Sequence, residues 1–130
     1  MTYICPICSA PLTLSDKSWA CVQRHQFDCA KEGYVNLLPV QFKHSKEPGD
    51  NKAMVNARRE FLEQGYYQPL INRLTTIFQS LAEPSANVLD AGCGEGYYTH
   101  QHQTPLNTVY GVDIAKEAVK KAAKKYPESH

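Results

Sequence analysis

The chain has 130 residues, of which 42% are hydrophobic and 21% are charged, and its formal net charge is +1. This composition is typical of a soluble globular protein with one domain, or one small module plus part of another, and it argues against a disordered chain. No apolar run could cross a bilayer and no secretory signal is visible before Cys5, while the near-zero charge excludes nucleic-acid binding through charge alone.

Two short pairs of metal-binding residues stand at the start of the chain, Cys5-x2-Cys8 and Cys21-x3-His25. Two such pairs, separated by about a dozen residues, are typical of a tetrahedral zinc site. Thiolates and an imidazole suit Zn²⁺ better than Mg²⁺ or Ca²⁺, which prefer oxygen ligands. Four small buried residues or a disulfide pair are the alternatives. Five cysteines without a secretory signal favour a reducing cytosol and a metal over disulfides.

The first 40 residues are expected to form a loop-rich metal-binding module. The apolar stretch 18–22 predicts a strand that leads into the second ligand pair. A segment this short buries too little apolar surface to be stable alone, so metal binding would supply much of its folding free energy. The polar segment 41–52 contains a Pro-Gly-Asp turn and is the predicted linker.

Two helices are predicted after the linker. Apolar residues recur at helical spacing over 53–64, where Gly65 ends the pattern. A stronger amphipathic pattern covers 70–81, with Pro69 in its first turn and Glu83-Pro84 as its stop.

Strands and helices then alternate, which predicts the βαβ unit of an α/β fold. The predicted strands cover 87–90 and 108–113, and the predicted helices cover 97–103 and 115–126. Lysines of the last helix lie off its apolar face, which is typical of a solvated helix surface rather than a phosphate-binding patch.

A glycine-rich turn, Asp-Ala-Gly-Cys-Gly-Glu-Gly at 90–96, connects the first of these strands to its helix. Glycine has no Cβ, so the backbone can turn sharply and approach a ligand closely. An acidic residue at the end of the next strand can accept hydrogen bonds from ribose hydroxyls. Dinucleotide binders would require glycine at position 97, which is tyrosine here, so the pattern favours S-adenosylmethionine over a dinucleotide or a purely structural turn. The candidate cofactor-binding residues are Asp90, Gly92, Gly94, Gly96 and Asp113.

Three runs of sequence carry a resemblance to a known family: CPIC at 5–8, CVQRHQFDCAKEGYVNLL at 21–38 and DAGCGEGYY at 90–98. Together they resemble the bacterial large-subunit (23S) rRNA guanine-N1 methyltransferases of the RlmA family, and AKEGYVNLL is more specific than the metal spacing. The resemblance implies a zinc-ribbon-like module that helps to recognise an rRNA hairpin. It also implies a class I Rossmann-like methyltransferase domain that uses S-adenosylmethionine.

The resemblance also assigns residues. One structural Zn²⁺ per chain would be bound by Cys5, Cys8, Cys21 and His25, and Gly94, Glu95 and Tyr67 would contact the cofactor. The residues alone leave two alternatives open. Without the resemblance, the sequence favours an ordinary core aromatic for Tyr67. Cys29 could replace His25 as the fourth ligand, although the family pattern favours His25.

The chain departs from the family in length, because it offers two strand candidates where a class I domain has a larger parallel sheet. We therefore expect an N-terminal fragment of a cytoplasmic enzyme, with a zinc module at 1–40, a linker at 41–52 and an incomplete methyltransferase domain at 53–130. We expect this fragment to be inactive, with no assignable catalytic base and no membrane partner; a homodimer of the parent enzyme is left open.

Two other functions fit the sequence. In a non-enzymatic zinc-binding RNA module, exposed aromatic rings would stack on unpaired bases. The same rings would otherwise fill the small core; they are Tyr3, Trp19, Phe27 and Tyr34. The second alternative is an S-adenosylmethionine-dependent methyltransferase with another acceptor.

Overall fold

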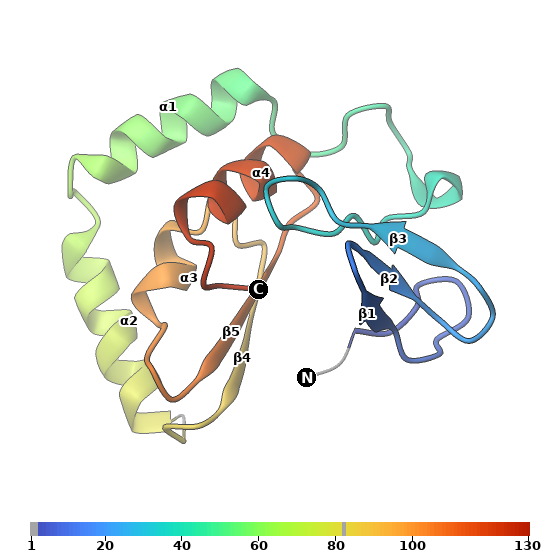
Figure 1. Cartoon of the computed structure of the whole chain (residues 1–130). Helices are drawn as coiled ribbons and strands as arrows, with labels where there is room; N and C mark the ends of the chain where they lie inside the picture. Colours follow the sequence, from blue (N-terminus) through green and yellow to red (C-terminus); the bar gives the residue numbers. More distant parts are fainter. Residues whose placement is uncertain (1–2, 82) are drawn as a thin grey trace. The chain divides into compact units, whose positions relative to one another are not determined.

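The computed structural model describes residues 3–81 and 83–130, and the chain divides into two compact units. Unit 1 ends at Lys46 and unit 2 runs from Glu47 to His130, so the division falls inside the segment 41–52. Each unit has a small sheet of its own (Figure 1).

Unit 1 contains a three-stranded antiparallel sheet in the order β1-β2-β3, formed by β1 (Thr13–Ser15), β2 (Ser18–Ala20) and β3 (Gln26–Asp28). β2 confirms the strand expected within 18–22, and it ends directly before Cys21. The two outer strands have three residues each, too few to show an alternating pattern in the sequence.

The core of unit 1 is small and surrounds the cysteines. Cys5, Leu12 and Cys21 are buried. The side chains that pack against them are partly buried and include Tyr3, Trp19, Phe27 and Leu37. The rings of Tyr3 and Trp19 meet edge to face with centroids 4.7 Å apart. Three of the four aromatic residues named above therefore fill the core. A 3-10 turn, η1 (Val40–Phe42), follows.

Unit 2 begins with the two predicted helices, α1 (Lys52–Glu63) and α2 (Gln68–Leu81). Asn51 caps α1, because its side chain accepts a hydrogen bond of 3.0 Å from the backbone N–H of Met54. Pro69 lies in the first turn of α2, where its missing N–H is not needed.

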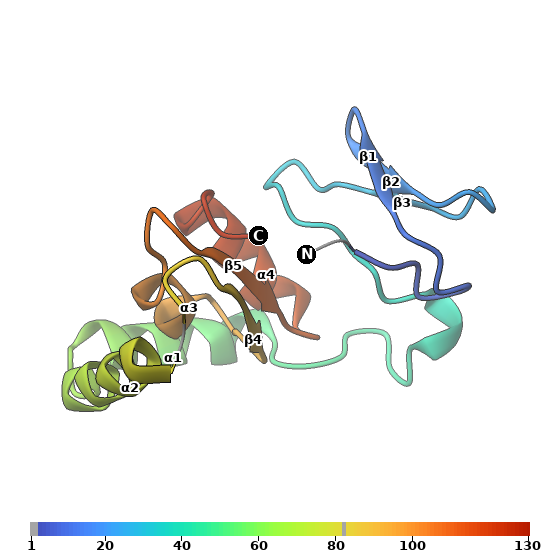
Figure 2. The same cartoon turned by 90° about the horizontal axis from the view of Figure 1, so that it is seen from below.

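A two-stranded parallel sheet follows, formed by β4 (Asn87–Ala91) and β5 (Thr108–Val112). Helix α3 (Tyr97–Gln101) connects the strands and α4 (Lys116–Lys125) follows them, which confirms the predicted βαβ order (Figure 2). Parallel pairing places the carboxyl ends of β4 and β5 at the same edge of the sheet.

Packing within unit 2 joins α1 to α4. Val55 of α1 forms a buried cluster with Ala115 and Ala118. Several large apolar residues remain exposed on α2 and β4: Leu70, Leu74, Ile77, Leu81 and Leu89. A two-stranded sheet buries little apolar surface, so unit 2 gains only modest stability from its core. Among the described residues, no helix is long and apolar enough to cross a membrane.

Candidate metal centre and cofactor site

Two short backbone turns present the four metal-ligand candidates. In the first, the N–H of Ser9 donates to the carbonyl of Cys5 at 2.8 Å. In the second, the N–H of Arg24 donates to the carbonyl of Cys21 at 3.0 Å. Ser9 and Arg24 both have left-handed φ angles, 61° and 66°, a conformation that costs a non-glycine residue about 1–2 kcal/mol. The sequence does not reveal these turns, because neither position is a glycine.

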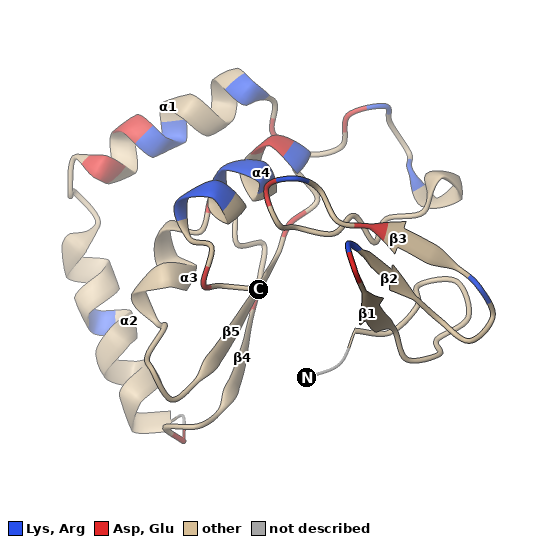
Figure 3. Ribbon diagram, viewed as in Figure 1, with Lys and Arg blue, Asp and Glu red and all other residues tan. Residues whose placement is uncertain are grey.

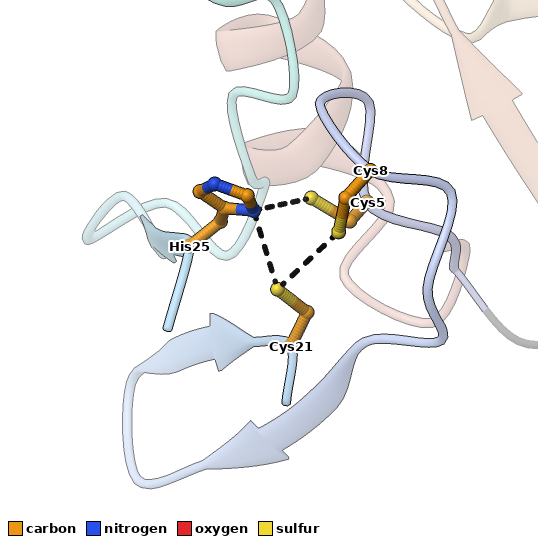
Figure 4. Close-up of side chains that lie close together, drawn as sticks. All are labelled: Cys5, Cys8, Cys21 and His25. Carbon is orange, nitrogen blue, oxygen red and sulfur yellow. Dashed lines mark hydrogen bonds between the residues drawn. The ribbon is translucent and has the colours of Figure 1, made fainter. Parts of the chain in front are cut away.

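The four candidate ligand atoms lie within 4.8 Å of one another (Figure 4). Nδ1 of His25 is 3.5 Å from Sγ of Cys5 and 3.4 Å from Sγ of Cys21, and Sγ of Cys8 is 3.7 Å from Sγ of Cys21. With Zn–S and Zn–N bonds of ~2.3 and ~2.05 Å, the edges of a tetrahedral site are about 3.5 Å for S···N and about 3.8 Å for S···S. These three separations fit the edges of a zinc tetrahedron, and Nδ1 is the ring nitrogen that faces the cysteines.

The environment of Cys5 favours its thiolate form. Burial alone would raise its pKa, but hydrogen bonds from the backbone of Ile7 and Cys8 outweigh burial and lower the pKa of Cys5 to about 7. A thiolate is the form that binds a metal. Cys29 lies apart from the cluster, in an isolated β-bridge with Val35. The structure thus brings His25, rather than Cys29, to the three cysteines.

In unit 2 the glycine-rich turn lies at the carboxyl end of β4. Gly92, Gly94 and Gly96 all have left-handed φ angles, 87°, 56° and 82°. A Cβ on Gly92 or Gly94 would meet no atom within 4 Å in the part of the chain that the structure describes. A Cβ on Gly96 would lie 3.0 Å from the ring of Tyr126. The turn therefore has a packed end at Gly96 and an open side at Gly92 and Gly94.

The two predicted aspartates hold different parts of the site: Asp113 binds the turn, and Asp90 binds the helix that follows it. Asp113 follows β5 and accepts hydrogen bonds from the backbone N–H of Gly94 at 2.9 Å and of Ala115 at 2.7 Å. Asp90 accepts a bond of 2.7 Å from the hydroxyl of Thr99, which is buried in α3. The sequence did not single out Thr99, although a hydroxyl nine residues after the aspartate, in the expected helix, was a usable signal.

Glu95 is a charged residue whose side chain is nevertheless buried. Its side chain is 5% exposed, and both carboxylate oxygens are buried without a hydrogen-bond partner among the described residues. Oε2 lies 3.8 Å from Nε of Arg59 in α1. Burial raises the pKa of Glu95, while the charge of Arg59 acts in the opposite direction.

Tyr67 lies between α1 and α2 and is 44% exposed, so it is not a core aromatic. Its ring meets that of Phe61 edge to face with centroids 5.3 Å apart. The pKa of Tyr98 in α3 is raised by burial and next by Tyr67, so these two residues lie near each other. Tyr67 is therefore held beside the helix that follows the glycine turn.

Cys93 is a buried thiol within the same turn. Burial raises its pKa to about 12, and the nearby charges of Asp113 and Asp90 add to the effect. The thiol stays protonated at neutral pH, and a protonated thiol is a poor nucleophile. Cys93 is therefore a small packing residue.

The residues present fit both groups that the sequence implied. Three cysteines and one histidine at tetrahedral spacing match Zn²⁺. The open side of the glycine turn offers a cradle that a Cβ would fill, and the carboxylate of Asp113 lies within hydrogen-bonding distance of its backbone. A compact ligand with ribose hydroxyls, such as S-adenosylmethionine, suits this arrangement.

Comparison with known proteins gives two family matches and two relatives. Residues 3–46 match the zinc-ribbon family described as "RlmA, N-terminal", and residues 82–129 match the family described as "Methyltransferase domain". The chain is 36% identical over 129 residues to the 23S rRNA (guanine(748)-N(1))-methyltransferase of Streptomyces fradiae, covering 96% of this chain and 45% of that protein.

The second relative comes from Micromonospora griseorubida and is assigned as a 23S rRNA (guanine-N(1)-)-methyltransferase. It is 33% identical over 145 residues, covering 96% of this chain and 48% of that protein. The chain thus spans about half the length of the curated relatives that it matches. Both alignments extend over residues of unit 1 and of unit 2, since each covers 96% of the chain.

Proposed function

We propose that this chain, which carries an RlmA-type zinc ribbon followed by the start of a methyltransferase domain, forms the zinc- and cofactor-binding half of an rRNA guanine-N1 methyltransferase. The alignment over 96% of the chain with a relative named for this activity is the observation that supports the proposal best. It joins unit 1 and unit 2 in one protein, whereas each unit alone would be compatible with many functions.

The proposed role of the zinc is structural. Cys5, Cys8, Cys21 and His25 would complete a four-coordinate site, which leaves no position for a reactive water. The ion would hold the two turns together and so fix the sheet of unit 1. We propose that the surface fixed in this way contacts an rRNA hairpin. Three aromatic residues of unit 1 pack into its core, so stacking on bases would depend on other side chains.

S-adenosylmethionine would supply a methyl group bonded to a sulfonium. The chain's own contribution is positional: Gly92 and Gly94 leave space for the ligand, and Asp113 holds the turn and can accept from ribose hydroxyls. Tyr67 would contact the ligand from the α1–α2 connection. Transfer to guanine N1 also requires loss of the N1 proton, and we assign no base for that step among the described residues.

Elemental analysis and calorimetric titration of the purified chain test the two binding proposals separately. We expect one zinc per chain and saturable binding of S-adenosylmethionine. NAD⁺ is the matched control ligand, and we expect it not to bind because position 97 is tyrosine rather than glycine. A chain that retains zinc but does not bind S-adenosylmethionine at millimolar concentration would contradict the cofactor proposal.

We propose that these 130 residues alone are inactive on rRNA, because they span about half the length of each relative. Incubation with 23S rRNA and labelled S-adenosylmethionine should give no methylated guanine. Methyl transfer by the purified chain would overturn this point. An rRNA substrate implies the bacterial cytoplasm, and we propose that location.

A further inference from the structure

Within the described part of the chain, the carboxylate of Glu95 is buried without the hydrogen bonds that would replace its contacts with water. Both oxygens are inaccessible and have no hydrogen-bond partner among the described residues. Burying an ionised carboxylate without hydrogen bonds is costly, so a nearby positive charge must offset part of the cost. The buried carboxylate of Glu95 therefore requires a charged partner, which a glutamate on the surface would not.

Arg59 of α1 is the nearest positive charge that the structure pairs with this carboxylate. Its Nε lies 3.8 Å from Oε2 of Glu95 and 3.1 Å from Oε1 of Glu63. The same oxygen of Glu63 also accepts a hydrogen bond of 3.0 Å from Lys125 of α4. Arg59 thus connects the glycine turn to a charge network between α1, which carries both signs, and the mainly basic α4 (Figure 3).

The turn around Glu95 depends on such an anchor. Gly94 and Gly96 flank it, and glycine loses more conformational freedom on ordering than any other residue. On one side, Gly94 is held by its bond to Asp113. On the other side, the N–H of Gly96 donates to the carbonyl of Cys93 at 3.0 Å. Between these two bonds, Glu95 supplies the side chain that reaches another element.

We infer that Arg59 is a positioning residue for the cofactor site: by pairing with Glu95, it holds the turn in the conformation whose open side at Gly92 and Gly94 receives the cofactor. The cofactor part of this inference rests on the function proposed above. The carboxylate of Glu95 pairs with Arg59 of α1 and so supports the turn, while the cofactor contact expected of Glu95 stays a prediction.

The test compares Arg59→Met with Arg58→Met, the adjacent arginine of the same helix, which pairs with Asp50 at 2.7 Å instead. Two readouts are used: the affinity for S-adenosylmethionine by calorimetry, and the hydrogen-exchange rate of the Gly94 amide by NMR in the absence of ligand. We expect Arg59→Met to weaken binding about tenfold and to accelerate Gly94 exchange by a similar factor, a change of ~1.4 kcal/mol.

Arg58→Met should leave both readouts within about twofold of the wild type, because changes to exposed ion pairs have small effects. Arg59→Lys should restore part of the binding, since it keeps the charge but loses the planar guanidinium. In a Glu95→Gln background, Arg59→Met should have little further effect on Gly94 exchange, because the pair is already broken.

Equal effects of Arg59→Met and Arg58→Met on Gly94 exchange would overturn the inference. A lower melting temperature with unchanged binding and unchanged exchange would also overturn it, since Arg59 would then be only structural. Failure of the wild type to bind S-adenosylmethionine would contradict the proposed cofactor-binding function instead. The exchange measurement would still decide whether Arg59 positions the turn.

Discussion

Unit 1 and unit 2 each contain a small sheet, but different interactions stabilise them. In unit 1, three buried residues and a few partly buried rings surround four metal-ligand candidates. In unit 2, a helix pair and a parallel two-stranded sheet position a glycine-rich turn through hydrogen bonds and buried charge. With the proposed zinc bound, the first unit would depend on one multivalent centre, whereas the second depends on many weak contacts.

This difference determines how each unit should respond to change. Loss of one ligand in unit 1 removes the centre that joins its two turns, so the effect should be large and cooperative. Loss of one contact in unit 2 removes only part of the support for its turn, so the effect should be smaller and local. The predictions below test this contrast, beginning with the largest expected effect.

Removal of zinc should unfold unit 1 and leave unit 2 largely unchanged. Structural zinc contributes of the order of 10 kcal/mol to small zinc modules, more than the core of unit 1 can supply. Cys21→Ser should have the same effect as a chelator, and Cys29→Ser is the matched control because it lies outside the cluster. NMR spectra should lose the dispersed resonances of Trp19 and keep those of Val109. Retention of the Trp19 signals without zinc would contradict the contrast.

Thr99→Val should destabilise unit 2 by about 1–3 kcal/mol, because it leaves an oxygen of Asp90 without its hydrogen-bond donor. Valine has nearly the shape of threonine, so packing changes little. Thr76→Val is the matched control, since its hydroxyl bonds the carbonyl of Asn72 on an exposed face of α2. Urea unfolding followed by circular dichroism measures both variants. Equal destabilisation by the two changes would show that the Asp90 contact is unimportant.

The sequence predicted the parts of both units that depend on local pattern. The spacing of Cys5, Cys8, Cys21 and His25 predicted the four side chains that the structure brings together, because they lie in two short segments. Apolar periodicity placed α1 and α2 within two residues of their observed starts. The glycines and alternating elements placed the turn at 90–96.

The parts that sequence could not reveal depend on contacts between distant segments. The outer strands β1 and β3 are too short to show periodicity. Arg59 and Glu95 are 36 residues apart, and nothing in either local pattern indicates that they meet. Ser9 and Arg24 adopt left-handed conformations that cannot be predicted from their residue types. Tertiary structure overrides local preference at each of these positions.

Gly94→Ala should weaken cofactor binding more than it weakens folding. A Cβ at this position would meet no atom of the described residues, so the folded chain loses only the backbone cost of about 1–2 kcal/mol for a left-handed residue. The same Cβ would occupy the space proposed for S-adenosylmethionine. Gly33→Ala in unit 1 is the matched control, because its φ is 103° and its surroundings are equally open. A fall in melting temperature without loss of affinity would contradict the proposed cradle.

The smallest effect is expected for Glu63→Gln, which should flatten the acid side of the pH–stability curve. Lys125 and then Arg59 lower the pKa of Glu63. Its carboxylate therefore stabilises the fold above the pKa of the unfolded chain, and this contribution is lost as the pH falls through the lower, folded-state pKa. Glu95 acts in the opposite sense, because burial raises its pKa and acid relieves the cost of its buried charge.

The matched control for Glu63→Gln is Glu60→Gln, which removes an exposed charge from the same helix without touching the Lys125 contact. Thermal unfolding from about pH 3, roughly one unit below the free-glutamate pKa, to about pH 7, well above it, measures both variants. The wild type should lose more stability than Glu63→Gln toward acid, whereas Glu60→Gln should follow the wild type. If Glu63→Gln also follows the wild type, the Glu63–Lys125 ion pair does not hold α1 to α4. The contact would then depend on the packing of Val55 against Ala115 and Ala118 and on the hydrogen bond from Lys121 to Asn56.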